Sequence, residues 1–143
     1  MQIDPGKYPI QTFKKDNKVF VKCIIRNRAI ELTPEEFIRQ VIIAYIIHEK
    51  SISKSKIAIE KGFEVNGRYK RFDAVIYNSV GAPWVLIECK QSEIKIDETV
   101  FLQASNYNKV LKAPYLWLSN GPNNQLFEIK NNKYEEVTDF NVN

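Results

Sequence analysis

The chain has 143 residues, of which 44% are hydrophobic and 27% charged, and this composition is typical of one globular domain and excludes a disordered chain. No apolar run approaches the ~20 residues that cross a bilayer, and the first ten residues carry no secretion signal, so we expect a cytoplasmic protein without a membrane partner. The formal net charge is +4, and the single histidine, His48, excludes a multi-histidine zinc site. Chemistry must therefore come from carboxylates, lysines or amides.

The positive charge is concentrated in two segments. Residues 1–30 hold seven bases and two acids, and residues 49–71 hold seven bases and three acids. Solvated surface lysines would account for both segments. A surface that attracts the phosphate backbone of a nucleic acid is the alternative, although charge alone favours solvated lysines. Charge is therefore compatible with a polyanionic partner and does not by itself identify one.

The first third of the chain predicts a strand followed by a helix. Residues 18–25 read as a strand, and residues 1–12 are expected to be frayed. Thr33 is suited to the helix N-cap, and Glu36, three residues later, completes a capping box. An apolar face then continues to about residue 50, which predicts a helix that packs on a core.

The remaining elements are six predicted strands and one helix. The strands are expected over residues 57–65, 71–78, 84–90, 115–119, 126–130 and 134–137. Asn66-Gly67 is a strong signal for a hairpin turn, and residues 97–112 predict the second helix. Glu60 lies within an apolar strand, where we expect it to have a structural partner, with the nearby bases Arg68, Lys70 and Arg71 as candidates.

Two carboxylates are predicted to face each other across neighbouring strands. Because strand side chains alternate, Glu88 and Lys90 share one face and Cys89 points to the other. If the turn before residue 84 centres between residues 80 and 81, the numbers of paired residues sum to 161 and Asp73 faces Glu88. Directly opposed residues have Cβ atoms about 5 Å apart. The two carboxylates would then hold one hard cation between them.

Such a pair of carboxylates destabilises the folded protein unless a cation binds between them. Two close carboxylates repel each other and lose hydration, whereas a divalent cation reverses the sign of the interaction. Magnesium suits one or two carboxylates together with water and a substrate phosphate, and the backbone carbonyl of Cys89 would add a third protein ligand. In the alternative interpretation, Asp73 pairs with Arg71, and Glu88 and Lys90 belong to an exposed strand end.

Residues flanking this pair have two possible roles. Gln103 and Tyr107 are four apart and share a helical face, where Gln103 would bond a metal-bound water, a DNA phosphate or the lysine. Alternatively, Tyr107 is a core residue and Gln103 satisfies a local backbone group. The bases Arg68, Lys70 and Arg71 either contact phosphates or form a solvated hairpin tip.

Asp73, Glu88-Cys89-Lys90 and Gln103-x-x-x-Tyr107 together resemble the active-site signature of the PD-(D/E)xK nuclease superfamily. More closely, the chain resembles the N-terminal nuclease domain of type I restriction enzyme R subunits, in a short stand-alone form. The resemblance covers about residues 18–130. It is carried by LTPEEFIRQ (32–40), the predicted strand that contains Glu60 together with VNGRYKRFDAVIY (65–77), VLIECK (85–90) and VFLQASNYNKVLKAPYLWLSNG (100–121).

The resemblance implies an α/β fold with a restriction-endonuclease-like core, in which a mixed central β-sheet is flanked by α-helices. We expect one domain over residues 1–143, in which residues 1–30 form an N-terminal β-strand or hairpin extension and residues 31–130 form the core. The implied reaction is magnesium-dependent hydrolysis of DNA phosphodiester bonds by an endonuclease, with manganese as a substitute. This places the protein among restriction or DNA-processing enzymes.

The resemblance also implies roles for individual residues. Asp73 and Glu88 would bind the metal. Lys90 would position or deprotonate the attacking water and stabilise developing charge, and Gln103 would support the site and contact the strand. A glutamate of the first helix often completes such sites. Glu36 is the first choice and Glu35 the alternative, although the capping box explains Glu36 equally well.

The chain departs from the family pattern in two places. Phe72 stands where a proline often precedes the first aspartate. No phosphate-binding Gly-x-x-x-x-Gly-Lys-[Ser/Thr] loop is present, so we expect the chain not to translocate DNA itself and to work with a separate motor or specificity protein. Two other functions remain open: a non-catalytic module that binds nucleic acid or protein through the same fold, and a nuclease that processes RNA.

Overall fold

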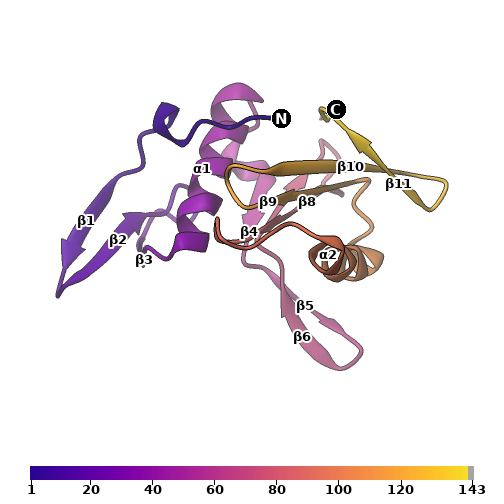
Figure 1. Ribbon diagram of the computed structural model, residues 1–143, viewed down its shortest axis with the longest axis horizontal. Coiled ribbons are helices and arrows are strands. Elements are labelled where there is room, and N and C mark those ends of the chain that lie inside the picture. The colour runs from indigo at the N-terminus through magenta and orange to yellow at the C-terminus, as the bar shows by residue number, and fades with distance from the viewer. Residues whose placement is uncertain (142–143) are drawn as a thin grey trace.

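The computed structural model describes residues 1–141, which fold around a six-stranded mixed β-sheet (Figure 1). The strand order is β11-β10-β9-β8-β7-β4, and β8 and β9 are the parallel pair. The strands are β4 Ile57–Ile59, β7 Ala74–Tyr77, β8 Pro83–Cys89, β9 Tyr115–Ser119, β10 Asn124–Lys130 and β11 Lys133–Val137. The predicted α/β class with a mixed central sheet is confirmed.

Two helices cover opposite faces of this sheet. α1 (Pro34–Glu49) begins where the Thr33 hydroxyl accepts a hydrogen bond from the Glu36 backbone N–H at 3.1 Å, as predicted for the N-cap. The reciprocal bond of the capping box is absent from the described residues, because the Glu36 carboxylate accepts from Arg39 and Gln40 instead. α2 (Glu98–Leu111) begins in the same way at Asp97. No helix among the described residues is long and apolar enough to cross a membrane.

Each helix packs on its own hydrophobic core. The first core joins buried residues of α1, such as Ile42, to Ile87 and Trp117 of the sheet. The second joins Ala104 of α2 to Leu86 and other residues of the opposite face. Consecutive residues of β8 therefore alternate between the two cores, as expected for a strand buried on both faces.

The register between β7 and β8 is the one predicted from the sequence. Ala74 pairs with Ile87 and Val75 pairs with Leu86, so paired numbers sum to 161. A bulge between Ile76 and Tyr77 shifts the register only beyond this point, toward the connecting turn. The end of the pair that carries Glu88 is therefore in the predicted alignment.

The N-terminal region is more ordered than predicted. A separate three-stranded sheet contains β1 (Thr12–Lys15), β2 (Lys18–Lys22) and β3 (Ala29–Glu31), in the order β1-β2-β3. The prediction of one strand over 18–25 was wrong beyond residue 22, because the chain turns there to form β3. A short 3-10 helix, Pro5–Lys7, precedes this sheet, and a second, Lys54–Lys56, follows α1.

The expected fraying of residues 1–12 was also wrong, because two hydrophobic residues in this segment are buried. Ile3 and Tyr8 both belong to the first core. The Tyr8 ring stacks on His48 and meets Tyr45 edge-on, so it packs against α1. This contact holds the N-terminal segment on the body of the domain.

The predicted strand over 57–65 is two strands in two sheets. β4 ends at Ile59, and β5 (Gly62–Val65) pairs only with β6 (Arg68–Arg71) in a hairpin that projects from the domain in Figure 1. The break falls at Glu60, whose φ of 47° is in the left-handed region and ends the extended conformation. Asn66 and Gly67 form the predicted turn, both with positive φ.

The predicted strand over 71–78 is likewise interrupted, because Phe72 and Asp73 lie between β6 and β7. Here the chain passes from the projecting hairpin back into the central sheet. The Glu60 N–H donates to the Asp73 carbonyl at 3.2 Å. The point where the chain leaves the central sheet is therefore hydrogen-bonded to the point where it returns. This connection places Asp73 at the start of β7, one residue before the strand begins.

Candidate functional site

The predicted site residues meet in one polar cavity of about 160 Å³. Its walls come from the start of α1, the crossing before β7, the end of β8 and one face of α2. The lining residues are Glu35, Arg71, Asp73, Glu88, Lys90, Val100, Gln103, Ala104 and Tyr107. Residues separated by up to 72 positions in the sequence thus surround one small volume.

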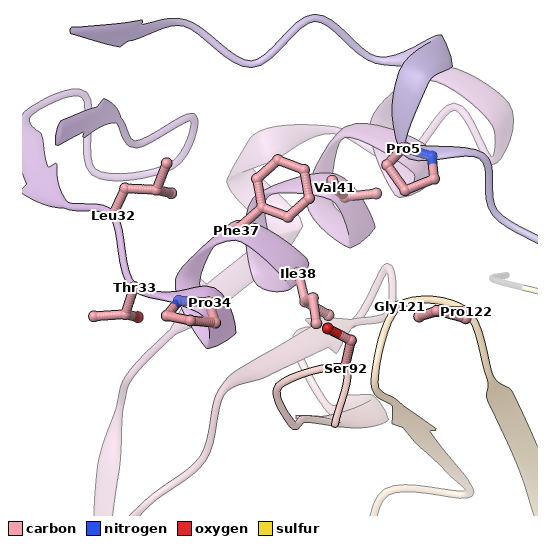
Figure 2. Close-up of a pocket in the computed structure, with 10 residues that line it drawn as sticks. All are labelled: Pro5, Leu32, Thr33, Pro34, Phe37, Ile38, Val41, Ser92, Gly121 and Pro122. Atoms are coloured by element: carbon pink, nitrogen blue, oxygen red, sulfur yellow. The ribbon is translucent and has the colours of Figure 1, made fainter. Parts of the chain in front are cut away.

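A second cavity near the start of α1 has a different character (Figure 2). Its volume is about 310 Å³, and apolar side chains such as Phe37, Ile38 and Val41 surround it. None of its lining residues is charged. Of these two cavities, the polar one is therefore the one that has groups for acid–base or metal chemistry.

Asp73 and Glu88 form a pair of buried carboxylates in the polar cavity. Asp73 directly precedes Ala74, and the β7–β8 register continued by one step places it opposite Glu88. Asp73 Oδ2 accepts a hydrogen bond of 2.7 Å from the backbone N–H of Cys89. Glu88 Oε1 is buried and has no hydrogen-bond partner among the described residues.

The repulsion between the two carboxylates and the loss of hydration both affect the pKa of Glu88. Burial raises the pKa of Glu88 well above its usual value, and the neighbouring Asp73 raises this pKa further. A buried oxygen without a hydrogen-bond partner adds a desolvation cost, which the charge of Lys90 offsets only in part. A proton or a cation at Glu88 would remove the conflict.

Cys89 is on the other side of β8, with its thiol in the first core. Burial raises the pKa of this thiol well above its usual value, so it remains protonated and unreactive. Cys89 is not among the residues that line the polar cavity. Its backbone carbonyl as a metal ligand stays a prediction.

Lys90 follows β8 and brings a cation to the cavity. Its backbone N–H donates to the Ser119 carbonyl of β9 at 2.8 Å, which fixes where the side chain starts. Its ammonium makes no ion pair within 4.0 Å among residues 1–141, although it lines the same cavity as Asp73 and Glu88. The lysine is thus available for a ligand.

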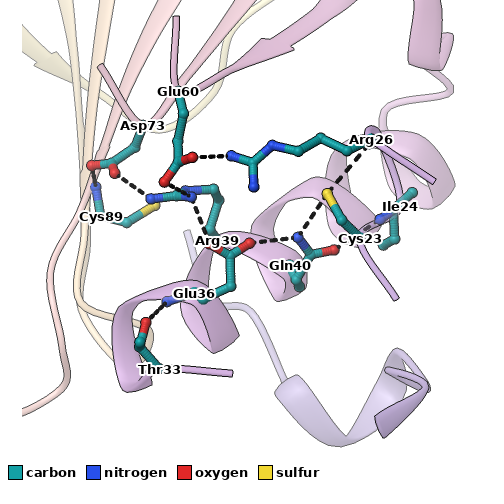
Figure 3. Close-up of polar contacts among 10 residues, drawn as sticks. All are labelled: Cys23, Ile24, Arg26, Thr33, Glu36, Arg39, Gln40, Glu60, Asp73 and Cys89. Atoms are coloured by element: carbon teal, nitrogen blue, oxygen red, sulfur yellow. Dashed lines mark hydrogen bonds and ion pairs between the residues drawn. The ribbon is translucent and has the colours of Figure 1, made fainter. Parts of the chain in front are cut away.

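Arg39 is the centre of an ion-pair network beside the cavity (Figure 3). Its Nη2 donates to Asp73 Oδ1 at 2.8 Å, and its Nη1 donates to Glu36 Oε2 at 2.6 Å and to Glu60 Oε1 at 3.0 Å. Burial alone would lower the pKa of Arg39, but the carboxylates of Asp73 and Glu36 outweigh it and raise this pKa. A permanent cation therefore lies against one oxygen of Asp73.

Sequence reasoning did not assign Arg39 a role. The signal was a charged residue on the apolar face of α1, between Ile38 and Val41, both of which are buried. A buried arginine requires paired acids. The network also answers the alternative interpretation of Asp73, because its ion-pair partner is Arg39 and not Arg71.

Glu60 has the structural partner that was expected, but with different bases. Its carboxylate pairs with Arg39 and with Arg26, which lies in the turn between β2 and β3. Burial alone would raise the pKa of Glu60, whereas the two arginines lower it overall. The bases of the β5–β6 hairpin are not its partners.

Of the two helix glutamates, Glu35 lines the cavity and Glu36 does not. Glu36 is buried and accepts hydrogen bonds from Arg39 and from Gln40 Nε2, the latter at 2.8 Å. The preference for Glu36 is therefore corrected in favour of Glu35. Burial raises the pKa of Glu35, and the charge of Asp73 raises this pKa further.

α2 and the β5–β6 hairpin bring the remaining predicted residues near the site. Gln103 and Tyr107 both line the cavity. Tyr107 also meets Phe63 of the hairpin edge-on at 6.4 Å, and the Lys70 ammonium lies 5.8 Å from the centre of the Tyr107 ring. Arg71 lines the cavity, whereas Arg68 is exposed on the hairpin outside it.

The residues present fit one hard cation. No group of three or more histidine, cysteine, aspartate and glutamate side chains is close enough to bind a metal within the described part of the chain. Two carboxylates with room for water and a phosphate form the set that Mg²⁺ prefers. The unpartnered buried oxygen of Glu88 is the structural observation that fits such an ion.

Comparison with known proteins connects this arrangement to a family. Residues 34–140, which include α1, the polar cavity and the whole central sheet, match the family model described as type I restriction enzyme R protein N terminus. No curated protein matches the chain significantly. The N-terminal sheet, β1-β2-β3, lies outside the matched residues.

Arg39→Met should destabilise the protein by about 3–5 kcal/mol, because it leaves Glu36, Glu60 and Asp73 without their shared cation. The free energy of unfolding from urea titrations measures this loss. Arg68→Met, on the exposed hairpin, should change it by less than about 0.5 kcal/mol. Equal stabilities of the two variants would contradict the central role of Arg39.

Glu88→Gln should stabilise the protein at pH 8 without divalent metals. The raised pKa of Glu88 means that its charged form is disfavoured in the folded state. The charged carboxylate therefore lowers the free energy of unfolding most at high pH, and this destabilisation disappears as pH falls through the raised pKa. The urea midpoint of the variant should exceed that of wild type at pH 8, and the difference should shrink toward pH 5. The exposed control Glu93→Gln should show no such trend; a constant difference for Glu88→Gln would refute this account.

Proposed function

Because the chain belongs to the family of type I restriction enzyme R protein N termini, we propose that it is a magnesium-dependent deoxyribonuclease. The observation that carries the proposal is the buried pair of Asp73 and Glu88, with its unpartnered oxygen, in one cavity with Lys90. A site that only stabilised the fold would gain from replacing such a pair with apolar residues.

Asp73 and Glu88 would hold the cation, with the backbone carbonyl of Cys89 as the proposed third ligand. Bound Mg²⁺, or Mn²⁺ in its place, would neutralise charge on the scissile phosphate and favour attack by water. The Cys89 N–H and the Arg39 guanidinium hold the two oxygens of Asp73 in place. Because both oxygens of Asp73 are already bonded, Glu88 is the carboxylate with an unpartnered oxygen for an incoming cation.

Lys90 would act on the attacking water and on the phosphate. Its ammonium is free of ion pairs within the described chain and lines the cavity together with both carboxylates. A cation here orients a water molecule and stabilises the negative charge that develops on the phosphate oxygens. Glu35 lines the same cavity with a raised pKa, so it is suited to accept a proton from that water.

Contacts to the DNA strand would come from α2 and the β5–β6 hairpin. Gln103 and Arg71 line the cavity, so they would contact phosphates next to the cleaved bond. Arg68 and Lys70 extend along the projecting hairpin, where they would contact phosphates further from the site. A separate motor or specificity protein would deliver the domain to its DNA.

One observation favours a non-catalytic alternative, in which the fold binds nucleic acid or protein without cutting. Both oxygens of Asp73 already accept hydrogen bonds, from Arg39 and from Cys89, so this residue is satisfied without a metal. The unpartnered oxygen of Glu88 opposes this alternative. Measurements of metal binding and of DNA cleavage distinguish the nuclease from the non-catalytic module.

Wild-type protein should nick supercoiled plasmid or cut single-stranded DNA in the presence of Mg²⁺ or Mn²⁺. Lys90→Ala should reduce the rate at least about 100-fold, since it removes the cation that stabilises the transition state. Lys95→Ala, in the exposed loop after β8, is the matched control and should cut like wild type. Equal activity in wild type and Lys90→Ala would indicate a contaminating nuclease, and cleavage of RNA alone would assign a different substrate.

Metal binding should also raise the melting temperature. At a metal concentration ten times the dissociation constant, linkage stabilises the folded state by about 1.4 kcal/mol, which corresponds to a few degrees for a domain of this size. Glu88→Gln should abolish the shift, whereas Glu93→Gln should retain it. If millimolar Mg²⁺ and Mn²⁺ leave the melting temperature of wild type unchanged and no DNA is cut, the non-catalytic alternative holds.

A further inference from the structure

The net positive charge of the chain resides in the small N-terminal sheet. Residues 12–31, from the start of β1 to the end of β3, contain six bases and two acids. The rest of the chain contains fifteen bases and fifteen acids. The sheet therefore carries a local charge of +4 on a molecule that is otherwise neutral, which is a strong attraction for a polyanion.

One face of this sheet combines aromatic rings with lysines. The register pairs Phe13 with Phe20 and Lys15 with Lys18, so these four side chains share a face. Lys22, two residues after Phe20, lies on the same face. Glu31 of β3 pairs with Phe20, so it lies on this face too, where it forms an exposed ion pair of 3.4 Å with Lys18. A phosphate would have to replace this weak surface pair. We call Phe13, Phe20, Lys15, Lys18 and Lys22 the aromatic–lysine face.

The aromatic–lysine face points to solvent. Val21 and Ile30 pair with each other on the opposite face of the sheet, and Val21 is fully buried, so that face packs on the domain. On the outward face, Phe13 is 46% exposed, which is high for a phenylalanine. Figure 1 shows the sheet extending from α1 on the side away from α2.

The two rings form a stacked pair. Their centroids are 5.7 Å apart and their planes differ by 19°. An exposed ring, here Phe13, with lysines on either side is an arrangement on which an unpaired base stacks while the backbone phosphates meet ammonium groups. Bases in a duplex are already stacked on each other and do not offer a free face.

The sheet is also connected to the polar cavity. Arg26, in the turn between β2 and β3, pairs with Glu60, which pairs with Arg39, which in turn bonds Asp73. A strand held on the sheet is thus held on an element that is fixed to the site by ion pairs. The sheet lies outside residues 34–140, so the family match does not account for it.

We propose that the aromatic–lysine face of the β1-β2-β3 sheet binds single-stranded DNA, with a base stacked on Phe13 and phosphates bound by Lys15, Lys18 and Lys22. This binding surface is separate from the cleavage site and requires no metal. It gives the domain a preference for DNA that has an unpaired segment beside the cleaved bond.

Fluorescence anisotropy with labelled oligo-dT in EDTA tests the proposal, because no cleavage occurs there and binding is read alone. Phe13→Ala should weaken binding to oligo-dT about ten-fold, the size of the loss of one stacked base, and should change binding to a duplex of equal length by less than two-fold. Phe13→Trp should bind at least as tightly as wild type. Replacing Lys15 and Lys18 with Gln should make the salt dependence less steep.

Val19→Ala is the matched control, since Val19 lies in the same hairpin on the opposite face and is 36% exposed. Cross-strand aromatic pairs also stabilise hairpins, so each variant is checked by its melting temperature. Wild-type binding by Phe13→Ala, or equal losses for Phe13→Ala and Val19→Ala, would overturn the proposal and leave a protein partner as the occupant. Equal losses on single-stranded and duplex DNA would overturn it as well.

The outcome is independent of the proposed nuclease activity. If wild type cuts DNA, and Phe13→Ala weakens oligo-dT binding while Val19→Ala does not, both proposals stand. If wild type cuts DNA and Phe13→Ala binds oligo-dT normally, the nuclease stands and the aromatic–lysine face is refuted. If wild type cuts nothing and Phe13→Ala weakens oligo-dT binding, the face stands and the nuclease fails.

Discussion

The buried guanidinium of Arg39 connects the parts of the molecule that the site requires. It bonds Glu36 in its own helix, Glu60 at the end of β4 and Asp73 before β7. Because a buried cation needs several acceptors, these three segments must converge at one point. The chain leaves the central sheet after β4 and returns before β7 at that same point, so the β5–β6 hairpin projects from it.

This convergence also divides the acids near the cavity into two groups. Glu36, Glu60 and one oxygen of Asp73 are neutralised by arginine. Glu88 and Glu35 are not, and both have a raised pKa for the same physical reasons, burial and the nearby charge of Asp73. The uncompensated negative charge is thus limited to the cavity, which is the place where a metal ion and Lys90 would complete the charge balance.

The sequence was sufficient for features that depend on local rules. The Thr33 cap and the β7–β8 register followed from capping chemistry and from strand periodicity. Arg39 and the left-handed Glu60 could not be predicted in the same way, because their conformations depend on partners distant in the chain. The choice between Glu35 and Glu36 failed for a related reason: adjacent helix residues point about 100° apart, and only the packed position of α1 decides which one meets the cavity.

Two elements outside the cavity carry further positive charge. The cavity itself combines the carboxylates of Glu35, Asp73 and Glu88 with the bases Arg71 and Lys90. Arg68, Lys70 and Arg71 of the β5–β6 hairpin provide one basic surface, and the N-terminal sheet provides the larger one. Both emerge from chain segments bonded to the Arg39 network, through Glu60 and Arg26. The ion pairs that position the carboxylates therefore also fix the two basic surfaces relative to the cavity.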